Sequence, residues 1–180
     1  MQKEIIVSGT DPGNTWQEIA EDLKVLSSAS ECHLVLIRED RRILTDIVTA
    51  ESGPASTTLS SYLYNRDDFR FSIHTKGLAD EIGKFFGMED LVLGFSTFDE
   101  KFIVKTNGEE RTAALFSDAN IRQVFESLPD LSLGIIHYLT ENAEGKVPFL
   151  ELKINAAITD PEVLREIFDV YSGVLTKLDS

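Results

Sequence analysis

The sequence predicts an α+β fold, with an antiparallel sheet or sheets of about eight strands and about five helices packed on them. Three observations predict this class. Short runs in which apolar and polar residues alternate recur along the chain and are bounded by turn residues. Segments with apolar residues at helical spacing lie between groups of these runs. The connections between neighbouring strand-like runs are short, which favours antiparallel pairing.

Length and composition indicate a single globular domain over residues 1–180. The 180 residues are 42% hydrophobic and 27% charged, which are ordinary values for a folded domain. Basic residues number 17 and acidic residues 31, so the formal net charge is −14. Nucleic acids and anionic membranes attract positive surfaces, so we expect neither as a partner. No apolar run is long enough to cross a membrane.

The first part of the chain predicts one helix and then four strands. Residues 1–10 form either a short strand or a docked tail. Thr15 and Glu18 have the spacing of a capping box, and the apolar residues that follow predict a helix over 15–28. In the fourth expected strand, His74 falls on the polar face, which we expect to be solvated. The four strands are expected over residues 33–38, 43–48, 56–64 and 69–75.

The middle of the chain predicts a helix and then two strands around a short turn. Apolar residues that share one helical face predict the helix over 78–87. Strand-like runs over 91–95 and 101–106 flank the sequence Phe-Asp-Glu-Lys-Phe. If this turn is helical, Phe98 and Phe102 lie on one face and anchor it to the core. We therefore expect a structural turn that joins the two halves of the fold.

The next segment predicts two helices and then two strands. Asn107 has the position of an N-cap, with Glu110 at the third position of a short helix. Apolar spacing predicts a second helix over about 118–128. Two strands follow, and we expect them over residues 131–139 and 149–154.

The last segment predicts the longest amphipathic helix of the chain. Asp160 followed by Pro161 is typical of a helix start, and the apolar face continues to Leu178. Gly173 lies within this helix, either as a weak point or as a close-packing contact. Terminal amphipathic helices often dock on a neighbouring protein, so we expect this helix to be the interface for a partner or a second copy.

No motif indicates a catalytic or metal centre. Cys32 is the only cysteine, so an internal disulfide is impossible and a reducing, cytoplasmic location is expected. His33, His74 and His137 lie on separate predicted strands, without the spacing of metal ligands. Neither a phosphate-binding glycine motif nor a nucleophile elbow is present. We therefore predict no catalytic residue, no metal site and no cofactor.

Four residues are candidates for a binding surface. Asp99, Lys105 and Asn107 follow one another through the central turn and the strand after it. They could form a ligand or partner surface, although the preferred interpretation of Asp99 is that its carboxylate binds backbone amides within the turn. His74 could belong to a small polar site on its strand.

The stretch 69–107 resembles a pattern in a family of uncharacterised bacterial domains. It contains FRFSIHTKG, then FFGMEDLVLG and then FDEKFIVKTN, and the combination FD-x-x-F-x-V-K-x-N is its most specific part. The resemblance implies a shared fold and a shared structural turn. It implies no catalytic residue, because no activity is assigned to that family. Some of its members are attached to membrane segments, and we expect no such anchor here.

Three functions are consistent with these patterns. The leading hypothesis is a soluble, non-enzymatic module that binds a protein partner or assembles with itself. The second is a module for a small ligand, with an apolar pocket between the sheet and the helix at 78–87. The third is a hydrolase-like enzyme that uses His74 or Cys32, which requires that residue to lie in a cleft beside a carboxylate or hydroxyl group.

Overall fold

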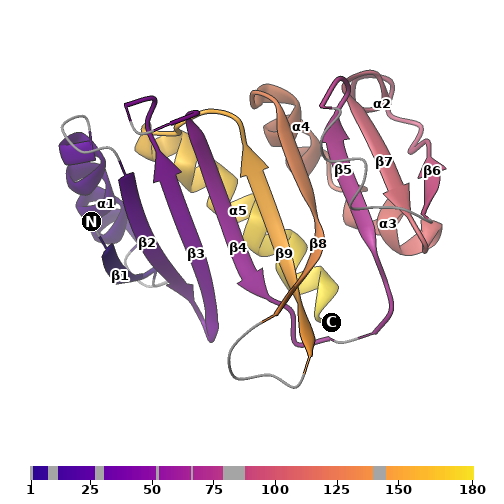
Figure 1. Cartoon of the computed structure of the whole chain (residues 1–180), viewed down its shortest axis with the longest axis horizontal. Coiled ribbons are helices and arrows are strands. Elements are labelled where there is room, and N and C mark those ends of the chain that lie inside the picture. Colours follow the sequence, from indigo (N-terminus) through magenta and orange to yellow (C-terminus); the bar gives the residue numbers. More distant parts are fainter. Residues whose placement is uncertain are drawn as a thin grey trace.

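The described part of the chain folds as one nine-stranded sheet with five helices. The structure is a computed structural model, and it describes residues 2–7, 12–26, 31–51, 53–65, 67–78, 88–139 and 145–180. The strand order is β1-β2-β3-β4-β9-β8-β5-β7-β6. Helices α1, α5, α4 and α3 cover the face of the sheet that points away from the viewer in Figure 1. The predicted α+β class is confirmed.

The elements have the following bounds. The strands are β1 (Gln2–Ile6), β2 (Glu31–Arg38), β3 (Arg41–Val48), β4 (Ser56–Tyr62), β5 (Phe71–Thr75), β6 (Glu89–Leu91), β7 (Phe102–Thr106), β8 (Leu131–Leu139) and β9 (Lys146–Ile154). The helices are α1 (Pro12–Leu26), α2 (Ser96–Lys101), α3 (Glu109–Leu115), α4 (Ala119–Ser127) and α5 (Pro161–Leu178).

The sheet is mixed because its first strand runs parallel to its neighbour. β1 pairs with β2 in parallel, with Gln2 opposite His33, whereas the other pairs are antiparallel. Parallel neighbours need a crossover connection, and α1 provides it. Of the two possibilities for residues 1–10, the strand is therefore observed, and it adds a ninth strand to the expected eight.

The core lies between the sheet and the helices, and α5 is its main helical component. Leu164, Ile167, Phe168 and Tyr171 of this helix are fully buried. The hydroxyl group of Tyr171 donates a hydrogen bond of 2.7 Å to the carbonyl oxygen of Leu150 in β9. Burial raises the pKa of Tyr171 well above its usual value. The apolar face of α5 is thus used inside the molecule, so the expectation that it forms an external interface is wrong.

Two expected helix starts differ from the structure. α1 begins at Pro12, so Thr15 lies inside the helix, and its hydroxyl group donates to the carbonyl oxygen of Ile6 instead. α3 has Gly108 as its N-cap, without a capping side chain, because the preceding Asn107 side chain binds another segment. The start of α5 is as predicted, since Asp160 accepts hydrogen bonds from the first-turn amides at 2.9 and 3.2 Å.

Two further expectations concern the middle of the chain. The strand expected over 91–95 is shorter and earlier, because β6 covers Glu89–Leu91. The helix expected over 78–87 falls on residues 79–87, which lie outside the described residues, and so does the apolar pocket expected beside it. Within the described ranges, none of the helices combines the length and the apolar character that a membrane crossing requires.

Candidate functional site

The Asp99 carboxylate stabilises the central turn. Its two oxygens accept hydrogen bonds from the amides of Leu93 (3.0 Å) and Gly94 (2.8 Å). Gly94 has a φ of +85°, a conformation that favours glycine. The predicted role of Asp99 in binding backbone amides is therefore confirmed. It holds the segment that enters α2 in place.

The other candidates on this stretch are engaged separately. Lys105 forms an ion pair with Asp90 of the neighbouring β6, at 2.7 Å. The amide side chain of Asn107 accepts from the backbone amide of Arg70 and donates to the carbonyl oxygen of Asp68, both at 2.7 Å. Asn107 thereby holds the loop before β5, whereas Lys105 joins two strands. The three side chains serve three different local contacts.

His74 lies in the sheet interior. Its strand β5 is flanked by β7 and β8, and every residue of β5 is buried, including His74 at 1% exposure. The expectation of a solvated face at this strand is wrong. The alternation of apolar and polar residues in the sequence correctly assigned side chains to the two faces of β5. It could not show that both faces are covered.

Cys32 does not have the surroundings of a nucleophile. Its side chain is buried in the hydrophobic core on β2. Burial raises the pKa of the thiol above 9.0, which keeps it protonated, whereas a nucleophilic cysteine needs a depressed pKa. His33, the next residue, instead lies 2.6 Å from a carboxylate oxygen of Asp46 on β3. Among the described residues no three His, Cys, Asp or Glu side chains group as a metal site would require.

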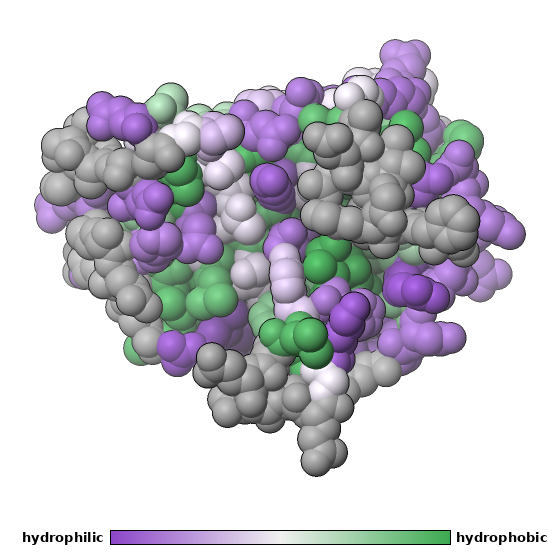
Figure 2. All heavy atoms as spheres, viewed as in Figure 1, coloured by the Kyte–Doolittle hydropathy of each residue, from purple (hydrophilic) through white to green (hydrophobic). Residues whose placement is uncertain are grey.

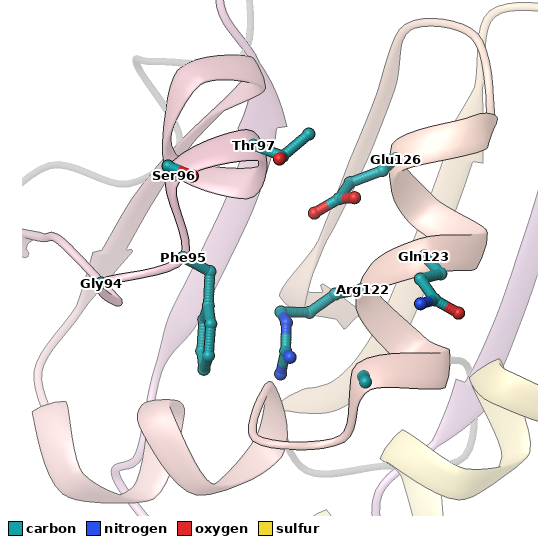
Figure 3. A pocket seen from close by; sticks show the side chains of 8 residues that line it. Gly94, Phe95, Ser96, Thr97, Arg122, Gln123 and Glu126 are labelled. Carbon is teal, nitrogen blue, oxygen red and sulfur yellow. The ribbon is translucent and has the colours of Figure 1, made fainter.

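A cleft of about 360 Å³ lies between α2 and α4. One wall is the turn that Asp99 stabilises, together with the start of α2, and the other wall is one side of α4. Figure 3 shows the Arg122 side chain beside the ring of Phe95 and the Glu126 carboxylate directed across the cleft toward Thr97. The lining residues are Gly94, Phe95, Ser96, Thr97, Ala119, Arg122, Gln123 and Glu126.

The two walls of the cleft are joined at both ends. At one end the Arg122 guanidinium lies 3.6 Å from the centroid of the Phe95 ring and donates to the carbonyl oxygen of Phe116. At the other end the Lys101 ammonium donates to the carbonyl oxygens of Glu126 and Leu128, at the C-terminal end of α4. A cation at that position stabilises a helix and satisfies its last carbonyl groups. The cleft is therefore built between braced elements.

A row of aromatic residues crosses the opposite face of the sheet, on the side without α5. The row consists of Tyr64, Tyr62, Phe149 and Tyr138, and we call it the aromatic row. Its consecutive ring centroids lie 5.6, 5.8 and 5.6 Å apart, with edge-to-face geometry. Tyr62 and Phe149 are direct cross-strand partners in β4 and β9. Tyr64 and Tyr138 are 53% and 41% exposed, so the row remains accessible.

The surroundings of the aromatic row are also partly apolar. Leu44 on β3 is 43% exposed on this face, and Val35 on β2 lies opposite it. Figure 2 is viewed from this side and shows hydrophobic side chains gathered over β2 and β3, with polar side chains around them. This face thus combines accessible rings with aliphatic surface.

Neither the cleft nor the aromatic row was identified from the sequence. The segment 118–128 was assigned by its apolar face, and Arg122 and Glu126 on its other side look like an ordinary charged pair one turn apart. The tyrosines look like ordinary strand residues. Only the pairing of β4 with β9 and of β9 with β8 brings residues 62, 149 and 138 together.

Comparison with known proteins adds no family assignment. No protein-family model matches the sequence, and no curated protein matches it significantly. The crystal structure of the mycobacterial trehalose monomycolate transport factor A, TtfA, is similar with a TM-score of 0.44 and 8% sequence identity. That alignment covers 94% of this chain and 93% of the other. The resemblance to a family of bacterial domains stays a prediction.

Proposed function

We propose that this protein is a non-enzymatic interaction module that binds a protein partner through the aromatic row. The row is the observation that carries the proposal. Tyrosine and phenylalanine are enriched at protein interfaces, because their rings bury a large area and lose little conformational freedom. Two of the four rings are more than one-third exposed: Tyr138, on the regular strand β8, and Tyr64, two residues after the end of β4.

The geometry of the row suits a partner surface, and the Tyr64 ring at its end is held by the Arg41 guanidinium, 4.0 Å from its centroid. The rings contact one another edge to face across three strands, which gives a rigid platform. The Tyr138 hydroxyl group is further fixed, because it donates to the Glu151 carboxylate on β9. A preorganised aromatic surface loses less side-chain entropy on binding than a flexible one.

Charge favours a basic partner over a second copy. Each chain has a formal net charge of −14, so two copies repel each other as they approach. A partner with a positive surface gains long-range attraction instead, which speeds association and makes it dependent on salt. The proposed partner is therefore a protein with a basic surface that meets the aromatic row.

The proposal can be tested by photocrosslinking in the cells that produce the protein. Benzoylphenylalanine is placed at position 64 or at position 138, and at position 92 as a control. Val92 is 78% exposed but lies next to β6, at the far end of the sheet from β4. We expect one discrete adduct from positions 64 and 138, with a basic protein, and none from position 92.

A second variant separates the aromatic row from general exposure. Phe149→Ser removes the central ring, and it should abolish the adduct, whereas Val92→Ser should leave it unchanged. Absence of any adduct, or an equal adduct from position 92, overturns the proposal. An adduct between two copies of this chain overturns the choice of a basic partner and shows self-assembly instead. Sedimentation velocity on the purified chain checks that result independently.

A further inference from the structure

Two side chains of opposite charge line the α2–α4 cleft. Arg122 and Glu126 are one helical turn apart on α4 and both line the cleft. Within the described part of the chain, neither of them forms an ion pair with any residue or with the other. Residues at this spacing commonly pair on a helix surface, so their separation needs a cause.

The cause is the packing of Arg122. Its guanidinium lies over the Phe95 ring and donates to the carbonyl oxygen of Phe116, which precedes α4. Both contacts draw the cation away from Glu126 and toward the N-terminal end of the helix. A guanidinium has five N–H donors in a fixed fork, so one bond to Phe116 leaves donors for a ligand. The Glu126 carboxylate remains directed toward Thr97 (Figure 3).

We propose that the α2–α4 cleft binds a small zwitterion of the α-amino-acid class. The ligand carboxylate binds the Arg122 guanidinium, and the ligand ammonium group binds the Glu126 carboxylate. A volume of about 360 Å³ suits a small molecule. This site is separate from the aromatic row, and the inference does not rest on the proposed partner.

The arrangement of charge discriminates against simpler ions. A plain carboxylate is attracted by Arg122 but is repelled by Glu126 and by the net charge of −14. A plain amine is attracted by Glu126 and repelled by Arg122. A zwitterion satisfies both groups, and it allows the planar guanidinium to bind the carboxylate through two parallel hydrogen bonds.

The test is a titration of the ¹⁵N-labelled full chain, followed by NMR. Each of the proteinogenic L-amino acids is added separately, and propionate and ethylamine are added as the two halves of alanine. We expect at least one amino acid to shift the amide resonances of residues 94–97 and 119–126, whereas the two halves shift them far less. The proposal is overturned if propionate or ethylamine binds as strongly as the amino acid. It is also overturned if none of the amino acids shifts these resonances.

Two variants assign the roles of the charged residues. Arg122→Gln should weaken binding of the amino acid about tenfold or more, because charge-assisted hydrogen bonds are lost. Glu126→Gln should weaken binding of the amino acid but not binding of propionate. That result would show that Glu126 recognises the ammonium group. Glu166→Gln, an equal change of charge on an exposed position of α5, is the control and should have no effect.

A third variant covers the case in which Arg122→Gln fails to fold. Arg122→Lys keeps a cation that can lie over Phe95 but removes the planar fork. It should keep the native spectrum and still bind the amino acid more weakly. Unchanged affinity in both Arg122→Lys and Glu126→Gln contradicts the proposed site.

Discussion

At the scale of the residue, Phe102 joins the central turn to the core. It is 2% exposed at the start of β7, and its ring centroid lies 4.7 Å from that of Phe98, which is itself fully buried. Phe102→Ala should lower the free energy of unfolding by about 3–5 kcal/mol, from lost burial and the cavity left behind. Urea denaturation measures the change. Val92→Ala, at an exposed position, should have little effect, and equal stability of the two variants would contradict the structural role of Phe102.

His137 gives a second prediction at this scale. Partial desolvation, followed by the nearby charges of Arg70 and Lys146, lowers the pKa of the exposed His137 below 6.5, its usual value. The unfolded chain then binds its proton more readily than the native chain, so stability rises with pH in this range. The stabilisation is complete above pH 6.5 and is lost as the pH falls toward the lower, native pKa.

The measurement is the melting temperature of wild type and of His137→Gln over this range. We expect a smaller decrease on acidification in the variant, because it cannot take up that proton. A steeper decrease in the variant would reverse the sign and refute the assignment.

Asp67 contributes to the pH dependence of stability at lower pH, because its pKa is also lowered. Burial acts in the opposite direction on this pKa, but hydrogen bonds from Arg111 and from the amide of Phe69 outweigh it.

At the scale of the element, α5 contains a glycine that the fold does not require. A Cβ atom added at Gly173 would meet no atom within 4 Å, so the close-packing alternative is wrong and the weak-point alternative holds. Gly173→Ala should raise the free energy of unfolding by about 0.5–1 kcal/mol, because alanine favours the helix. Gly134→Ala is the opposite case, because the added Cβ atom would lie 2.9 Å from the Phe71 carbonyl oxygen. This substitution should lower the free energy of unfolding. Chemical denaturation of both variants tests the pair.

The elements themselves were largely predictable, because each depends on local periodicity. The alternation in β3 and the apolar spacing in α5 are sufficient to identify them. The cleft was not predictable, because it requires α2 to pack against α4. That contact depends on Lys101 reaching the last carbonyl groups of α4, and a lysine at the end of a short turn gives no such signal in the sequence.

At the scale of the whole molecule, strand order separates what the sequence shows from what it cannot. The pairing of hairpin neighbours such as β2 and β3 can be predicted from their short connection. The insertion of β9 between β4 and β8 cannot be predicted in this way, since β4 and β9 are far apart in the chain. The aromatic row depends on this long-range pairing, so a surface of this kind is visible only after the sheet is assembled.

Net charge gives the last prediction, which concerns the stability of the whole chain. The net charge is −14, and the described part of the chain offers few ion pairs in compensation, among them those of Arg38 with Asp169 and of Arg111 with Asp67. Salt shortens the reach of charge from about 30 Å at 0.01 M to about 8 Å at 0.15 M, and so it weakens the repulsion within the native state.

Raising sodium chloride over that range should therefore raise the melting temperature. A gain of about 1 kcal/mol corresponds to a shift of about 2–4 °C for a chain of this size. Potassium chloride at equal ionic strength should give the same rise, because screening does not depend on the cation. The double variant Glu89→Lys and Glu166→Lys lowers the net negative charge at two exposed positions, so its response to salt should be smaller. A melting temperature that falls with salt would show that the ion pairs outweigh the general repulsion.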